Sequence, residues 1–171
     1  MKKITYILPA LFLVAVAACS PSTSNTTDTT TDTTAVATNT VADTSLTAKL
    51  TIQQTLVLGS PIEMTFTVYN KTDSSRTFCK WHTPFEPLMS KYLDITSTTG
   101  EEVAYKGPMA KRMMPPPADS YVSVKPGDSL SVNVDLLKAY DLKAAGTYTI
   151  KYNAEGISGI KAADSVTFII K

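Results

Sequence analysis

Cys79 and His82 are the two residues of this sequence whose types and spacing could begin a metal site. They lie three positions apart in Cys79-Lys80-Trp81-His82, and His82 is the only histidine of the chain. Thiolate and imidazole bind zinc or copper, but such sites use three or four protein ligands. Without a bulge, a strand would direct the two side chains to opposite faces, and no second cluster supplies the remaining ligands. We therefore expect no metal and no cofactor, with Cys79 and Trp81 packed in the core; a metal carrier is the alternative.

Catalytic motifs are missing from the sequence. The common zinc-hydrolase motif needs two histidines one helical turn apart with a glutamate between them, and this chain has a single histidine. No Gly-x-Ser-x-Gly elbow and no glycine-rich phosphate loop is present. We therefore expect no catalytic residues and no enzymatic activity.

Residues 106–117 form an unusual segment with the sequence KGPMAKRMMPPP, which holds four prolines, three methionines and the adjacent cations Lys111 and Arg112. Proline lowers the entropy cost of holding a loop extended, and methionine makes adaptable apolar contacts. These properties fit a loop that binds a partner. The alternative is a long crossover between two sheets whose methionines cover the open end of the core.

The start of the chain has the pattern of an export signal. Lys2 and Lys3 precede an uncharged, largely apolar run over residues 4–18, which is short for a membrane-spanning helix. The run ends in Val16-Ala17-Ala18-Cys19, which resembles the lipobox of bacterial lipoproteins. We therefore predict a signal peptide over residues 1–18 and lipid attachment at Cys19, whose acyl chains would hold the protein on a membrane.

Residues 19–44 follow as a predicted tether. They are rich in Thr, Ser, Asp, Asn and Ala, and such a composition buries too little apolar surface to offset the entropy cost of ordering. Ser20 follows the cysteine, and by resemblance to Gram-negative lipoproteins this favours the outer membrane. We therefore expect an outer-membrane lipoprotein of the bacterial envelope, facing either the periplasm or the outside.

Residues 45–171 are predicted to form one folded domain. Apolar and polar residues alternate with period two, which is typical of half-buried antiparallel strands. The rows are Leu46-Ala48-Leu50-Ile52, Ile62-Met64-Phe66-Val68, Leu130-Val132-Val134, Tyr148-Ile150-Tyr152 and Val166-Phe168-Ile170. Further strands are expected at residues 76–82, 92–98, 102–105 and 121–124. This pattern predicts an all-β, immunoglobulin-like antiparallel β-sandwich of about seven to nine strands, with one short helical turn over residues 136–142.

Three smaller features concern the turns, the cross-links and the charge of the domain. Gly146-Thr147-Tyr148 at a strand start suits a tyrosine corner. Once the signal is removed, Cys79 is the second cysteine beside Cys19, so an internal disulfide is not expected and the core must hold the domain. The formal net charge is +1, and Lys2 and Lys3 leave with the signal. A nucleic-acid partner, which would require a basic face, is therefore not expected.

The order of several motifs resembles a known family. These are Phe66-Thr67-Val68-Tyr69-Asn70-Lys71-Thr72, Trp81-His82-Thr83-Pro84-Phe85-Glu86, Tyr105-Lys106-Gly107-Pro108, Lys111-Arg112, Lys125-Pro126-Gly127-Asp128-Ser129, Val134-Asp135-Leu136-Leu137-Lys138-Ala139-Tyr140-Asp141-Leu142 and Gly146-Thr147-Tyr148-Thr149-Ile150. Together they resemble the amino-terminal propeptide domain of the deuterolysin (aspzincin) metalloendopeptidases, including the peptidyl-Lys type. The resemblance covers most of residues 46–152.

In that family the domain precedes a zinc catalytic domain, assists its folding and covers its active site. The present sequence stops at Lys171, where the protease domain would begin, so the resemblance implies a non-catalytic binding module. Its expected partner is a secreted zinc metalloendopeptidase, which it would inhibit or help to fold. The alternative is a structural or interaction lipoprotein of the bacterial envelope that is unrelated to proteolysis.

The expected partner-contact residues lie in two segments. They are Lys80, Trp81, His82, Pro84, Phe85, Lys111, Arg112, Met113 and Met114. A Lys-preferring protease would have an acidic pocket, and Lys111 or Lys80 would imitate a substrate in that pocket.

Overall fold

The computed structural model describes residues 45–162 and 164–171. The predicted signal peptide, Cys19 and the predicted tether lie outside the described residues.

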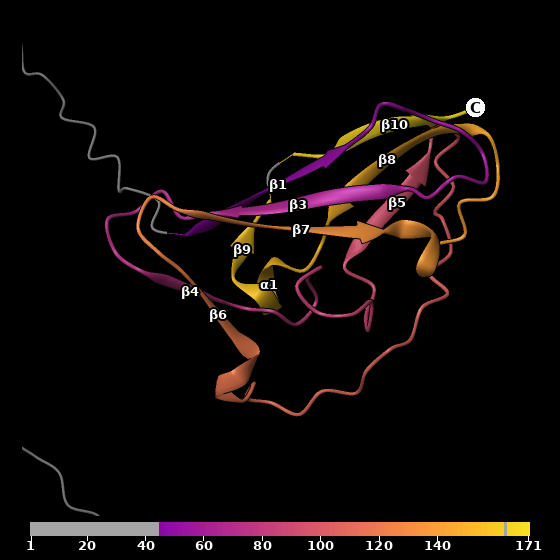
Figure 1. Cartoon of the computed structure of the whole chain (residues 1–171). Coiled ribbons are helices and arrows are strands. Elements are labelled where there is room, and N and C mark those ends of the chain that lie inside the picture. The colour runs from indigo at the N-terminus through magenta and orange to yellow at the C-terminus, as the bar shows by residue number, and fades with distance from the viewer. Residues whose placement is uncertain (1–44, 163) are drawn as a thin grey trace, which may run out of the picture. The chain divides into compact units, whose positions relative to one another are not determined.

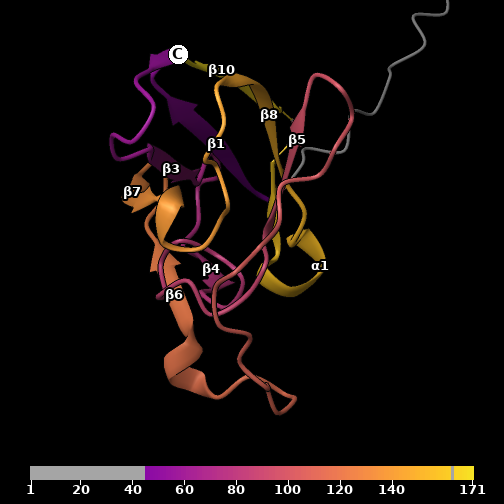
Figure 2. The ribbon, with the colours of Figure 1, turned by 90° about the vertical axis from the view of Figure 1, so that its right-hand side faces the viewer.

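Two four-stranded sheets form the two layers of a sandwich (Figures 1 and 2). The first has the order β7 (Ser129–Asp135), β3 (Glu63–Tyr69), β1 (Leu46–Ile52) and β9 (Ile160–Lys161). The second has the order β2 (Thr55–Leu56), β10 (Val166–Ile170), β8 (Gly146–Tyr152) and β5 (Leu93–Ser97). A separate antiparallel ribbon pairs β4 (Arg76–Cys79) with β6 (Tyr121–Val124).

The core lies between the two sheets and follows the predicted alternation. On β3, Met64, Phe66 and Val68 are fully buried, and the residues between them are partly exposed. On the second sheet, Ile150 and Phe168 are equally buried. Because inward side chains of both sheets belong to one hydrophobic cluster, the predicted immunoglobulin-like β-sandwich is confirmed.

Several details differ from the prediction because short segments pair according to their neighbours. The short strands β9 and β2 pair in parallel with β1 and β10, whereas the prediction was antiparallel throughout. The helix α1 (Glu155–Ser158) was not predicted. The predicted helical turn is the shorter 3-10 turn η2 (Leu136–Lys138). The described helices are single turns, and none has the length and apolar character needed to cross a bilayer.

One predicted strand was wrong, and a second ends earlier than predicted. Residues 102–105 form two isolated bridges, Thr96 with Glu102 and Tyr105 with Tyr140, because the chain touches two different neighbours there. The strand expected at residues 76–82 ends at Cys79, and the backbone of His82 has a positive φ of 57°, which turns the chain away from β6.

Asn70 fixes the junction between β3 and the β4–β6 ribbon. Its side chain is buried, and its amide nitrogen lies 2.8 to 3.1 Å from the carbonyl oxygens of Ser74, Val124 and Lys125. Its side-chain oxygen accepts hydrogen bonds from the N–H and the hydroxyl of Thr72. One buried side chain thus joins the turn after β3 to the end of β6, since buried amides need such partners.

The predicted tyrosine corner is present at the start of β8. The Tyr148 hydroxyl donates a hydrogen bond of 2.9 Å to the carbonyl oxygen of Ala144, four residues upstream. Its ring stacks on Phe168 of the neighbouring strand. This bond holds the loop that leads into β8.

Candidate functional site

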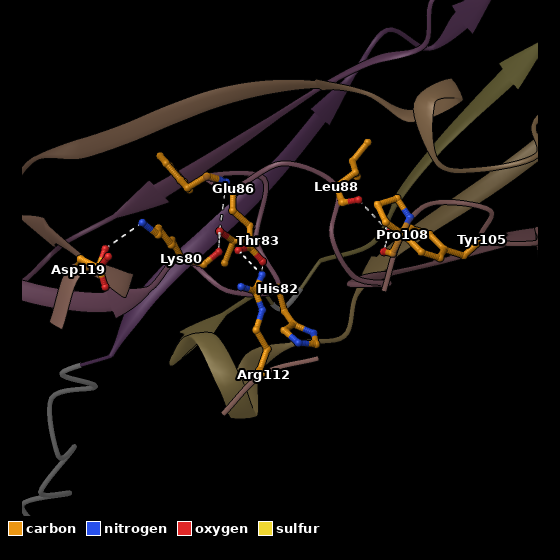
Figure 3. A network of polar contacts seen from close by, with 10 residues as sticks. Lys80, His82, Thr83, Glu86, Leu88, Tyr105, Pro108, Arg112 and Asp119 are labelled. Carbon is orange, nitrogen blue, oxygen red and sulfur yellow. Dashed lines mark hydrogen bonds and ion pairs between the residues drawn. The ribbon is translucent and has the colours of Figure 1, made fainter. Parts of the chain in front are cut away.

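Two loops that are far apart in the sequence meet beside the ribbon. The first, residues 80–92, connects β4 to β5, and the second, residues 105–117, leads to the 3-10 turn η1 (Ala118–Ser120) before β6. The N–H of Ala110 donates to the carbonyl oxygen of Met89 at 2.7 Å. The Tyr105 hydroxyl lies 3.2 Å from the carbonyl oxygen of Leu88 and 2.9 Å from that of Pro108 (Figure 3). The two predicted contact segments therefore form one surface region.

Arg112 connects the second loop to the first. Its guanidinium donates to a Glu86 carboxylate oxygen at 2.6 Å and lies 4.8 Å from the centre of the Trp81 ring. The Glu86 side chain is only 6 % exposed, and its other oxygen accepts the N–H of His82 at 3.0 Å. A buried carboxylate with a charged partner and an aromatic face makes a firm attachment for the second loop.

The first loop is itself held by a buried threonine. The Thr83 hydroxyl donates to the carbonyl oxygen of Lys80 at 2.7 Å and accepts the N–H of Phe85 at 3.1 Å. The Phe85 ring then packs against Phe78 and Phe66, with centroid distances of 5.1 and 6.4 Å. The loop is therefore anchored on the sandwich core.

His82 lies at the turn of this loop beside Arg112 (Figure 3). Burial lowers the pKa of its imidazole below 6.5, and the Arg112 charge lowers the pKa further, while Glu86 opposes both effects. The carbonyl oxygen of His82 accepts a hydrogen bond from the Tyr152 hydroxyl at 3.1 Å. His82 is thus held mainly through its backbone.

Cys79 is buried, as predicted, with 2 % exposure and a free thiol. Within residues 45–162 and 164–171, no group of three or more His, Cys, Asp or Glu side chains is arranged to hold a metal ion.

The predicted contact residues divide into buried and exposed groups. Trp81 and Pro84 are buried, and Phe85 is partly buried, so these three side chains support the surface from within. Lys80 and His82 are half-buried, and the Lys80 ammonium donates to the carbonyl oxygen of Asp119 at 2.9 Å.

The exposed group lies on the second loop. Met113 and Met114 are 84 % and 73 % exposed, Lys111 is exposed, and Arg112 is half-buried. We call residues 109–114 the methionine loop. Because its methionines face solvent, the alternative in which they cover the open end of the core is wrong. In Figure 2 this stretch lies at the lower end of the domain, between the end of β5 and η1.

Two residues of the site were missing from the predicted set. Met109 is 69 % exposed. It belongs to the same methionine-rich segment as Met113 and Met114, and this shared composition could have placed it in the predicted set. Glu86 accepts hydrogen bonds from both loops, but nothing in its sequence neighbourhood marks an acid that will be buried.

Comparison with known proteins agrees with this architecture. The immunoglobulin-like domain family matches residues 47–156, and the chain belongs to that family. An extracellular protease of Aeromonas hydrophila is 33% identical over 103 residues, which cover 57% of this chain and 28% of the protease. An uncharacterized secreted protein of Arthroderma benhamiae is 32% identical over 95 residues, which cover 53% of this chain and 48% of that protein.

The chain therefore spans less than half the length of either relative. Both relatives are described as extracellular or secreted, which is consistent with an extracellular or envelope location for this chain. The chain is thus an immunoglobulin-like domain with similarity to part of an extracellular protease.

Proposed function

We propose that this protein is a non-catalytic binding module for a secreted zinc metalloendopeptidase, acting as its inhibitor or folding chaperone, and that acylated Cys19 tethers it to the bacterial outer membrane. The main support is that Arg112 fastens the methionine loop to Trp81 and Glu86, which leaves Lys111, Met113 and Met114 exposed. The similarity to part of an extracellular protease supports an association with proteolysis.

The physical reason is preorganisation. A loop that is already held in place loses less conformational entropy on binding than a free loop, and methionine side chains adapt to the partner surface. Lys111 is exposed, and no described residue pairs with its ammonium, whereas Lys80 already bonds to Asp119. Lys111 is therefore the better candidate for a substrate-like side chain.

The binding test uses a mature metalloendopeptidase of the deuterolysin type. We expect the purified protein to slow peptide cleavage or to raise the refolding yield of the protease. Replacing Lys111 and Met113 by alanine together should weaken the effect by about ten-fold or more, as expected for contacts at the centre of an interface.

The matched control is Lys125→Ala, because Lys125 is exposed in the turn between β6 and β7. This control should keep the wild-type effect. Absence of any effect at high micromolar protein, or equal losses in both variants, would contradict the proposal. In that case the envelope-interaction alternative would replace it.

The tether has its own test. A labelled fatty acid fed to the producing bacterium should label the wild-type chain and should not label Cys19→Ala. Cys79→Ala is the matched control, because the Cys79 thiol is buried in the core, and this variant should be labelled normally. Equal labelling of the wild-type chain and Cys19→Ala would exclude Cys19 as the attachment site.

A further inference from the structure

The outer side of β7 is an open sheet edge. β7 stands at the end of the order β7-β3-β1-β9, and no strand of the described residues pairs with its outer side. It is seven residues long, and its sequence SLSVNVD contains no proline and no charge before the final Asp135. Long edges without proline or lysine are the ones that accept another strand.

The other sheet edges are shorter or covered. β2 and β9 have two residues each, and β4 and β6 have four each. β9 covers only Leu46 and Thr47 of β1, and the remaining stretch of β1 is shorter than β7 and carries Lys49. β5 is covered by the following segment, where the N–H of Val103 donates to Ile95 and the N–H of Ser97 donates to Glu101. Within the described part of the chain, β7 is therefore the edge best suited to pair with a further strand.

The backbone groups that face outward follow from the register with β3. The N–H of Asn70 donates to Asp128, and the N–H of Leu136 donates to Ile62, so even-numbered residues along β7 bond to β3. Because antiparallel ladders alternate, the N–H and C=O groups of Ser131 and Asn133 point away from β3. No described residue bonds to these outward groups.

A groove runs beside the C-terminal half of this edge. One wall is formed by Asn133, Val134 and Asp135, and the other by the segment that holds Pro84, Glu86, Pro87 and Leu88. The groove thus offers free backbone groups on one side and a largely apolar wall on the other.

The charges of the groove favour a basic occupant. Glu63 and Lys138 also line it, and Glu86 is already paired with Arg112. The remaining charged residues of the groove, Glu63, Asp135 and Lys138, have a net charge of −1. β7 itself carries no basic residue, so a second copy of β7 would not complement this groove.

We propose that the β7 edge binds an extended segment of a partner protein as an added strand, with apolar side chains against Pro87 and Leu88 and a basic side chain near Glu63. Backbone hydrogen bonds would supply affinity, and the basic side chain would supply selectivity. This inference does not depend on the proposed protease partner, because it uses neither Lys111 nor the exposed methionines.

The probe is a synthetic peptide as long as β7, seven residues, that alternates valine with threonine and has one lysine in the threonine row. Amide hydrogen exchange is measured by NMR on the acylated chain in detergent. We expect the Ser131 and Asn133 N–H groups to exchange about ten-fold more slowly with saturating peptide. A peptide with glutamate in place of lysine should bind more weakly, and Glu63→Lys should reverse that preference.

The backbone is tested with Asn133→Pro. Its N–H faces outward, so proline should be tolerated in the folded edge strand while it removes a donor needed by the added strand. The matched control is Asn133→Thr, which keeps the N–H and should bind like the wild type, whereas Asn133→Pro should lose binding.

Three results would overturn the inference. The first is equal peptide binding by Asn133→Pro and Asn133→Thr. The second is peptide-dependent protection of amides only on β4, β5 or β6. The third is protection of the β7 amides without peptide that grows with protein concentration, which would assign the edge to a second copy. If Asn133→Pro does not fold, the test is whether Glu63→Lys reverses the preference for the lysine peptide over the glutamate peptide. An unchanged preference would overturn the inference.

Discussion

His82 shows how one residue connects the core to the candidate site. Its positive φ turns the chain after β4, its N–H bonds to Glu86, and its carbonyl oxygen bonds to Tyr152 of β8. A non-glycine residue in this region of φ is uncommon and is stable only where surrounding contacts hold it. The backbone of His82 therefore shapes the loop, while its imidazole stays partly accessible.

The titration of His82 is the prediction at this scale. Because the chain has one histidine, its NMR signal is unambiguous, and we expect a midpoint below 6.5. Arg112→Gln should raise this pKa by removing a nearby cation, and Glu86→Gln should lower it by removing the carboxylate. A midpoint at or above 6.5 in the wild type would contradict the described burial.

The same shift has a consequence for stability. The folded pKa lies below the unfolded pKa, so the unfolded state binds more protons between the two values. The stabilisation from neutral His82 is therefore present above about pH 6.5 and is lost as the pH falls through the folded pKa. Thermal melts of the wild type and His82→Gln across this range should show a steeper pH dependence in the wild type.

At the scale of elements, the loop that leads into β8 depends on a side-chain bond. Tyr148 is 7 % exposed, and its hydroxyl holds the carbonyl oxygen of Ala144. After this corner, β8 forms five residue pairs with β10 on one side and five with β5 on the other. The corner therefore sets where β8 begins in the second sheet.

Tyr148→Phe should lower the free energy of unfolding by about 1–2 kcal/mol, because the Ala144 carbonyl loses its donor while the ring is kept. Denaturant unfolding measures this change. The matched control is Tyr121→Phe, because Tyr121 is 46 % exposed, and this change should have little effect. A loss in Tyr121→Phe as large as that in Tyr148→Phe would argue against the corner.

At the scale of the whole molecule, Phe66 links both layers to the site. It lies on β3 of the first sheet, and its ring is 5.2 Å from Tyr152 on the second and 6.4 Å from Phe85 in the first loop. Because Phe85 and Thr83 then position Arg112 through Glu86, the loop surface depends on the packing of the core. Stability and the candidate site are coupled here.

Phe66→Ala should destabilise the domain by about 3–5 kcal/mol, because it leaves a cavity between the sheets. Calorimetric unfolding measures the loss, and hydrogen exchange at the Ala110 N–H should report a looser methionine loop. Val57→Ala is the exposed control, since Val57 is 67 % exposed, and it should change neither quantity. A Phe66→Ala variant with an unchanged melt would contradict this account of the core.

The alternation of apolar residues was sufficient to predict the main strands β1, β3, β7, β8 and β10. Successive side chains of a strand point to opposite faces, so a half-buried strand shows its two faces as a local alternation of apolar and polar residues. The Gly146-Thr147-Tyr148 turn was predictable for the same local reason. Residues 106–117 stood out by their composition, and the contact residues were predicted from the family resemblance. The structure places both predicted contact segments in one region.

Only the tertiary structure decided which parts of the chain meet. Glu86 and Arg112 are 26 positions apart, and Asn70 and Val124 are 54 apart, so no local pattern indicates either contact. The parallel pairing of β2 and β9 and the open outer side of β7 also depend on neighbours that are distant in sequence. Burial of a charge or an amide is determined by the whole fold, because it requires partners that only the folded chain brings within hydrogen-bond distance.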